Sequence, residues 1–161
     1  MWAKSASIGA VYNPLEKRMR LALVPALAVA ALALTACSGA APTAEVGECL
    51  DLNVDAAEVS ELNGFDCATE HDVEVYYVGD STLADFDLEA VITEAQEICI
   101  REFEPFVGIA LEESTLDVYY LYPQQEGWNG GDREIICAVY TPNWDTGEVT
   151  RTTGSLKGAE V

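Results

Sequence analysis

The chain has 161 residues, with 8 Lys or Arg against 28 Asp or Glu and a formal net charge of −20 at pH 7. So acidic a surface repels nucleic acid, which we exclude as a partner. Hydrophobic residues make up 50% of the chain, and this content excludes an acidic disordered protein as well.

The N-terminal segment has the pattern of a bacterial export signal. Three basic residues precede an uncharged apolar run, Leu21–Ala36. Its sixteen residues are fewer than the ~20 that a membrane-spanning helix needs. We therefore predict that residues 1–36 are a signal peptide, with Met19 as an alternative start of translation. A short membrane helix is the competing interpretation.

The end of this run, Leu34-Thr35-Ala36-Cys37, resembles the lipobox of bacterial lipoproteins. The resemblance implies that the chain is cut before Cys37 and that the Cys37 thiol carries the lipid. Residues 37–45 then form the lipidated cysteine and a flexible tether, "SGAAPTA", and residues 46–161 form one folded domain. The predicted location is extracytoplasmic, at the outer face of the bacterial cytoplasmic membrane.

The predicted mature chain keeps 4 basic and 27 acidic residues, a formal charge of −23. This charge repels anionic lipid headgroups, so the lipid anchor must provide the attachment to the membrane. It either attracts a basic partner or divalent cations, or it simply keeps an exported domain soluble.

The predicted domain is rich in β-forming segments. Four segments with clustered β-branched and aromatic residues are expected to be strands, near residues 46–52, 72–78, 116–122 and 134–140. In "HDVEVYYVG", alternation places Tyr77 on the face of Val73 and Val75, and Tyr76 on the opposite face with Glu74.

A single long helix is predicted near residues 87–104. Apolar residues recur there at three- and four-residue spacing, and Pro105 is expected to terminate the helix. The simplest arrangement is an α+β domain, a small antiparallel sheet with this amphipathic helix packed on it. The order of the strands does not follow from the sequence.

Four cysteines remain after Cys37, and an even number in an exported chain predicts two disulfides. Their number alone allows three pairings. Cys99 lies on the apolar face of the predicted helix, and Cys137 lies on the inner face of the strand "EIICAVY". We therefore predict a disulfide between Cys99 and Cys137, which leaves Cys49 to pair with Cys67.

His71 is the only histidine and thus the only ordinary general base near neutral pH. The chain has no Gly-x-Ser-x-Gly turn, no His-Glu-x-x-His motif and no Cys-x-x-Cys spacing. We therefore predict no catalytic residue, no cofactor and no metal. By its position, His71 is expected to be half-buried and to hold the turn after Cys67 by hydrogen bonds; the alternative is a ligand or partner contact.

Further binding candidates surround the turn "GWNGGD". Trp128 and Trp144 are candidates for stacking on a sugar or for a protein contact, although Trp128 is as well suited to cover the end of the core. Asp132 and Arg133 are expected to form a local ion pair or cap. Because the mature chain has few basic residues, Arg133 is the one most expected to have an assigned partner.

Several segments carry a resemblance together: "VGECLDL", "CATEHDVEVYYVG", "EICIREFEPFVG", "YLYPQQEGWNGGDREIICAVY" and "TGSLKG". As a set they resemble the septum-formation-related domain family of actinobacterial envelope proteins, from Val46 to Gly158. The family usually has a proline just before the histidine, where this chain has Glu70. The resemblance implies a link to division septa and brings no catalytic activity.

The expected function is therefore that of a membrane-anchored extracytoplasmic lipoprotein, a non-catalytic binding or accessory module of the cell envelope. Its expected partners are the membrane, through the lipid anchor, and an envelope or division protein or a cell-wall glycan. The alternative is a small envelope hydrolase or cation-dependent enzyme that uses acidic residues. A deep pocket in which His71 or several carboxylates converge would favour that alternative. A sensory accessory domain is a third option.

Overall fold

The structure is a computed structural model that describes residues 41–54, 59 and 61–161. Its elements are β1 (Cys49–Leu50), β2 (Val73–Asp80), α2 (Leu88–Val107), the 3-10 helix η1 (Leu111–Glu113), β3 (Asp117–Leu121), α3 (Gln125–Asn129), β4 (Glu134–Pro142) and β5 (Val149–Thr150). The predicted signal peptide and Cys37 lie outside the described residues. Within the described part of the chain, no helix is long and apolar enough to cross a membrane.

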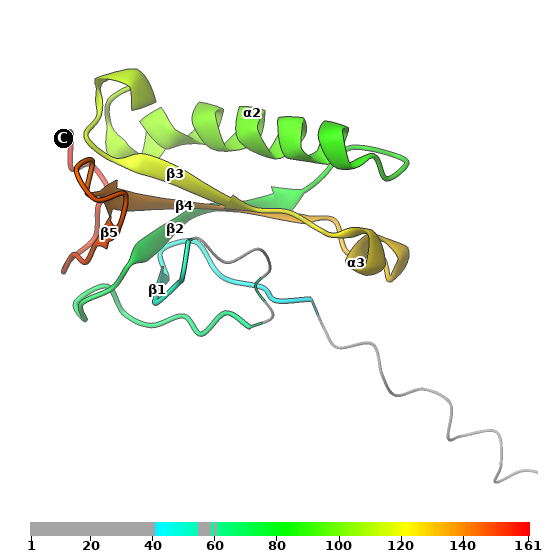
Figure 1. Ribbon diagram of the computed structural model, residues 1–161, viewed down its shortest axis with the longest axis horizontal. Helices are drawn as coiled ribbons and strands as arrows, with labels where there is room; N and C mark the ends of the chain where they lie inside the picture. The colour runs from blue at the N-terminus through cyan, green and yellow to red at the C-terminus, as the bar shows by residue number, and fades with distance from the viewer. Residues whose placement is uncertain (1–40, 55–58, 60) are drawn as a thin grey trace, which may run out of the picture. The chain divides into compact units, whose positions relative to one another are not determined.

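The strands form one sheet in the order β1-β2-β4-β3, and β5 pairs with the end of β4. Every pairing is antiparallel. Helix α2 lies along one face of this sheet, and the segment that contains β1 lies on the opposite side (Figure 1). The predicted α+β fold, a small antiparallel sheet with one main helix, is confirmed.

Helix α2 has a well-defined start and end. The Asp87 side chain accepts a hydrogen bond from the main-chain N–H of Ala90, a standard N-cap. The helix ends at Gly108, whose φ of 100° suits glycine. The predicted end at Pro105 is wrong, since the helix continues to Val107. A proline this close to the C-terminus removes one hydrogen bond, and the full burial of Val107 keeps the last turn packed on the sheet.

The sheet is buried on both faces, which explains the nearly continuous apolar sequence of β4. The face toward α2 carries the helix-side core, in which Phe103 and Val107 of the helix meet Ile135 and Val139 of β4. The opposite face carries a second core formed by the following buried residues: Ala44, Leu50, Leu52, Val73, Val75, Ile136 and Ala138.

A register shift interrupts the alternation of β2. The pairing with β4 shifts between Val75 and Tyr77, an irregularity typical of a β-bulge. Tyr76 and Tyr77 consequently both pack against the helix-side core, and Val78 packs against the second core. The predicted placement of Tyr77 on the face of Val73 and Val75 is therefore wrong.

Two disulfides cross-link the domain, and they are the two predicted pairs. Cys49 is bonded to Cys67 across 18 positions, and Cys99 to Cys137 across 38 positions. The second bridge joins the middle of α2 to the middle of β4, inside the helix-side core.

The ordered domain begins before the predicted boundary. Ala44 is buried in the second core, and the Thr43 hydroxyl donates a hydrogen bond to a Glu134 carboxylate oxygen at 3.1 Å. Residues 43 and 44 therefore pack on the domain and are not part of a free tether.

Candidate functional site

His71 lies between the turn after Cys67 and the start of β2, and it is fully buried, not half-buried as predicted. Its main chain exchanges two hydrogen bonds of 2.9 Å with Thr152, far along the sequence. The imidazole Nδ1 lies 2.8 Å from the Thr69 carbonyl oxygen, and Nε2 lies 3.3 Å from the Thr152 hydroxyl. Because a carbonyl only accepts, we assign the proton to Nδ1 and the acceptor role to Nε2. The ring thus holds the turn and presents no nitrogen to solvent.

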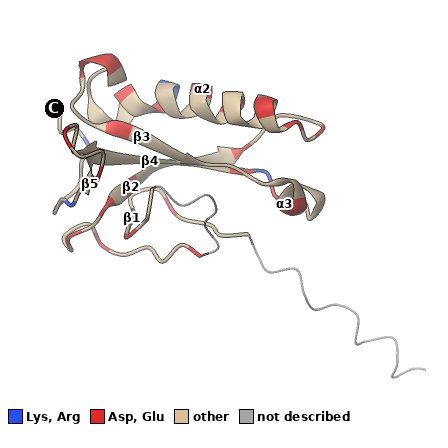
Figure 2. Cartoon of the chain, in the orientation of Figure 1, with Lys and Arg blue, Asp and Glu red and all other residues tan. Residues whose placement is uncertain are grey.

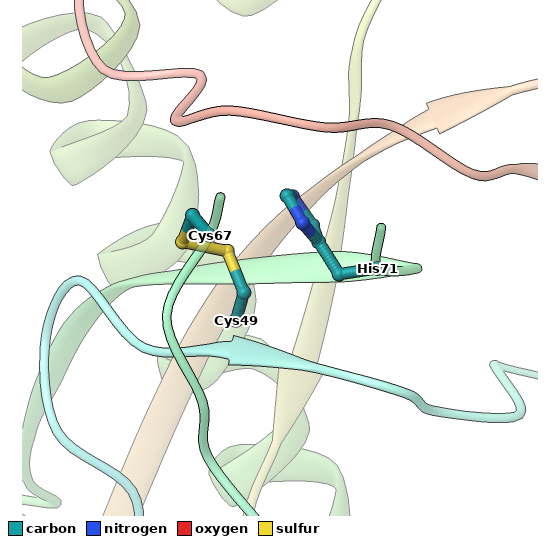
Figure 3. Close-up of side chains that lie close together, drawn as sticks. All are labelled: Cys49, Cys67 and His71. Carbon is teal, nitrogen blue, oxygen red and sulfur yellow. A yellow bond between two sulfur atoms is a disulfide. The ribbon is translucent and has the colours of Figure 1, made fainter. Parts of the chain in front are cut away.

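The Cys49–Cys67 disulfide lies next to this imidazole (Figure 3). One ligand atom from each of Cys49, Cys67 and His71 lies within 4.8 Å of the other two, and all three residues are buried. As a disulfide, the two sulfurs have no thiolate to offer a cation. In this oxidation state the cluster is a structural part of the domain.

Trp128, in α3, is buried at 6% exposure and does not form an exposed platform. Its ring makes an edge contact with Phe86, with centroids 5.6 Å apart. The Arg133 guanidinium carbon lies 3.6 Å from the ring centroid, a cation–π contact. Trp128 thus covers the end of the core, which is one of the two interpretations given from the sequence, and a binding role for it stays a prediction.

Asp132 and Arg133 use their side chains within the turn that follows Trp128. The Arg133 guanidinium donates to the main-chain carbonyls of Trp128 and Asp132, at 2.9 and 2.6 Å. The Asp132 carboxylate instead accepts from the Glu134 N–H. The contact between Asp132 and Arg133 thus runs through a main-chain carbonyl and is not an ion pair, while the bond from Arg133 to the Trp128 carbonyl at the end of α3 forms the local cap that was predicted as the alternative. A binding role for either residue stays a prediction.

Among the described residues, the cation with the most carboxylate partners is Arg151, which sequence reasoning missed in favour of Arg133. Its guanidinium lies 2.7 Å from Asp51, 3.1 Å from Asp72 and 3.3 Å from Glu70. The hydrogen bond to Asp51 is the main cause of its raised pKa. These ion pairs join the segment after β5 to two segments far earlier in the chain. Local sequence patterns do not reveal such long-range contacts.

Glu74 is a second residue that the sequence did not single out. It is 2% exposed, and its carboxylate accepts from the Ser155 hydroxyl and the Leu156 N–H, both at 2.6 Å. The sequence signal that could have identified Glu74 is the presence of an acidic residue within an apolar strand. Glu74 docks the "TGSLKG" segment onto β2, so this motif has a structural explanation.

Trp144, one of the two tryptophans in the described residues, is 72% exposed in the turn between β4 and β5. The Asn143 carboxamide oxygen accepts from the N–H groups of Asp145 and Thr146, which fixes the turn. Of the two tryptophans considered from the sequence, Trp144 is therefore the one available to a partner.

Asp and Glu residues are spread along the helix and the loops (Figure 2). A shallow groove of about 510 Å³ runs along the start of α2, lined by Leu83, Asp87, Glu89, Ala90, Thr93, Glu94 and Glu97. Glu94 already accepts hydrogen bonds from Ser81 and Thr82. His71 is not among the residues of this groove, so the convergence that would favour a hydrolase is not found there.

Comparison with known proteins gives a family and two relatives. The family described as "Septum formation" matches residues 46–161. The chain is 29% identical over 104 residues to "Putative lipoprotein LppN" of Mycobacterium tuberculosis (strain ATCC 25618 / H37Rv) and to the protein of the same name in Mycobacterium bovis (strain ATCC BAA-935 / AF2122/97). Each match covers 62% of this chain and 57% of the relative. No solved structure matches the chain.

The family match spans all of the described strands and helices, from β1 to β5. It also includes both disulfides and the docked C-terminal segment. It covers well over half of the chain, and the chain therefore belongs to the septum formation family.

Proposed function

We propose that the protein is a lipid-anchored accessory module of the cell envelope that acts in septum formation without catalysing a reaction. The observation that carries this proposal is the match of the family to residues 46–161. The sequence before this domain supports the anchor, because it resembles a lipoprotein signal that ends at Cys37, and both relatives carry the name of a lipoprotein.

A non-catalytic role is supported by the state of the reactive side chains in the described domain. His71 is buried with both ring nitrogens engaged, and the four cysteines of the domain form disulfides. The acidic groove at the start of α2 is shallow and open, whereas a hydrolase needs a cleft that surrounds its substrate.

The partner in this proposal is an envelope or division protein, or a cell-wall glycan. Trp144 is the side chain best placed for such a contact, because it is exposed on a turn with a fixed main chain. Tryptophan adds large apolar area at little entropic cost, which suits a contact residue in either class of partner.

Complementation of a deletion strain tests this function. The wild-type gene, Cys37→Ala and Trp144→Ala are each returned to cells that lack the protein, and septum spacing is measured by microscopy. We expect the wild type to restore normal septa and Cys37→Ala to fail, because its product is not anchored. Trp144→Ala should restore them only in part.

Lys157→Ala serves as the control for Trp144→Ala, since it changes another exposed residue near the C-terminus. Membrane fractionation shows whether each variant is anchored. Normal septa in the deletion strain, or full rescue by a Cys37→Ala protein found in the soluble fraction, would contradict the proposal.

A further inference from the structure

We propose that Cys49, Cys67 and His71 form a Zn²⁺ site when the Cys49–Cys67 disulfide is reduced. The site is separate from the proposed envelope function and does not depend on it. Cys67 and His71 lie four residues apart in the sequence, but Cys49 joins them only in three dimensions, because it is 18 residues before Cys67.

The backbone holds the three donors close together from different segments. Cys49 exchanges two main-chain hydrogen bonds of 3.0 Å with Phe65, two residues before Cys67. His71 is held by the paired bonds to Thr152. The Cα atoms of Cys49 and Cys67 are 5.1 Å apart, and the three ligand atoms lie within 4.8 Å of one another. These hydrogen bonds are independent of the disulfide, so they can keep the donors near one another after reduction.

Reduction changes what this cluster can bind. A dithiol reductant transfers two electrons and two protons to the Cys49–Cys67 disulfide, which becomes two thiols while the reductant becomes a disulfide. Zn²⁺ then displaces both thiol protons, forms two Zn–S bonds and takes the lone pair of His71 Nε2, which gives up its hydrogen bond with the Thr152 hydroxyl. A water molecule completes the fourth position, as in sites with three protein ligands.

The dimensions suit this ion. Tetrahedral zinc, with Zn–S of about 2.3 Å and Zn–N of about 2.0 Å, places its ligand atoms roughly 3.5–3.8 Å apart. The present separations of up to 4.8 Å come into this range when the two cysteine side chains rotate toward the imidazole, which its hydrogen bond to the Thr69 carbonyl holds in place. The donor set of two thiolates and one imidazole favours zinc over magnesium or calcium, which prefer oxygen ligands.

Burial and hydrogen bonding add to the argument. Two buried thiolates without a counter-ion would be strongly unfavourable, and a divalent cation neutralises both. The hydrogen bond between His71 Nδ1 and the Thr69 carbonyl fixes the ring, as a carbonyl commonly does behind a metal-bound histidine.

The second disulfide provides a matched control within the same chain. Cys99 and Cys137 are also buried and bonded to each other. His71 is the only histidine in the chain, so reduction of this pair supplies two thiolates without an imidazole. It should bind zinc more weakly than the cluster around His71.

The test uses the full-length protein in detergent, oxidised or reduced without oxygen, with Zn²⁺ in equilibrium dialysis and Co²⁺ as the spectroscopic probe. We expect one tightly bound Zn²⁺ per reduced chain, none in the oxidised chain, and thiolate-to-cobalt charge-transfer absorption. Cys99→Ser/Cys137→Ser should keep this site, and Cys49→Ser/Cys67→Ser should lose it. His71→Asn, which keeps a donor toward Thr69, should bind at least about tenfold more weakly.

If the double serine variants fail to fold by circular dichroism, the comparison of wild type with His71→Asn still decides the proposal. Equal affinity of these two proteins, absence of the charge-transfer absorption, or equal binding by the oxidised and reduced chains would overturn it.

Discussion

At the scale of single residues, Glu74 links the end of the chain to the centre of the sheet. Its buried carboxylate accepts two short hydrogen bonds from the segment around Ser155. Glu74→Ala leaves the half-buried Leu156 N–H without its acceptor, and we expect a loss of about 1–3 kcal/mol in the free energy of unfolding. Denaturation in urea measures this loss.

Ser155→Ala is the control for Glu74→Ala, because it removes one of the two bonds to Glu74, together with the acceptor of the exposed Lys157 N–H, and leaves the Leu156 N–H paired. It should cost about 0.5–1.5 kcal/mol. A Glu74→Ala protein as stable as the wild type would show that the carboxylate does not hold the C-terminal segment.

Glu94 makes the stability of the domain depend on pH. Burial raises its pKa, but the hydrogen bonds from Ser81 and Thr82 outweigh burial and lower the pKa below its ordinary value of 4.5. The folded state therefore binds this proton more weakly than the unfolded state does. The stabilisation is present above the ordinary pKa and is lost as pH falls through the lower, folded value.

We therefore expect the difference in unfolding free energy between wild type and Glu94→Gln to be largest near pH 7 and to shrink below about pH 4.5. Urea denaturation across this range measures it. Glu97→Gln removes a charge from the same groove without touching Ser81 or Thr82, and it controls for the change in charge. A difference that stays constant or grows toward low pH would refute the assignment.

At the scale of elements, the helix and the two disulfide pairs were predictable because the sequence patterns that indicate them are local. The three- and four-residue spacing of apolar residues identified the helix, and the apolar positions of Cys99 and Cys137 identified their pairing. The helix end was misjudged at Pro105 because the burial of Val107 and the backbone of Gly108 decide it, and burial is a tertiary property.

The bulge in β2 shows why alternation fails as a guide to faces. A period of two places Tyr76 and Tyr77 on opposite faces, but one shift of register moves both toward α2. Tyr76 then donates a hydrogen bond from its hydroxyl to the Cys99 carbonyl, and its burial raises its pKa far above the ordinary value. The shift arises between strands that are far apart in the sequence, so no single segment encodes it.

The two disulfides should differ in their contribution to stability. The loop-entropy account gives about 4 kcal/mol for the 38-residue separation of Cys99 and Cys137 and about 3 kcal/mol for the 18-residue separation of Cys49 and Cys67. Double alanine variants of each pair, unfolded in urea without reductant, measure these contributions. Unchanged stability in either variant would contradict the account.

At the scale of the whole molecule, strand order and the candidate site depended on contacts that the sequence does not reveal. Strands β2 and β4 are the central neighbours of the sheet, and both contribute buried residues to the cores on its two faces. His71 was predicted to hold a turn, but its full burial and its position beside the Cys49–Cys67 disulfide result from pairing with Thr152. Trp128 is buried in contact with Phe86 and Arg133, so Trp144 is the more accessible of the two tryptophans considered from the sequence.

The proposed function is that of an anchored, non-catalytic domain of the septum formation family. Its functional part depends on where the protein is found during division, since the folded domain alone does not select a place in the envelope. The most direct measurement is the position of the full-length protein in dividing native cells, with a fluorescent tag after Val161 that functions outside the membrane. Val161 is exposed, so it offers a site for the tag.

The account predicts enrichment of the tagged protein at the septum, and loss of this enrichment in Cys37→Ala. Growth and septum spacing of the tagged strain must match those of the untagged strain, which shows that the tag does not interfere. Uniform staining of the envelope at every stage of division, with the anchor intact, would contradict a role in septum formation.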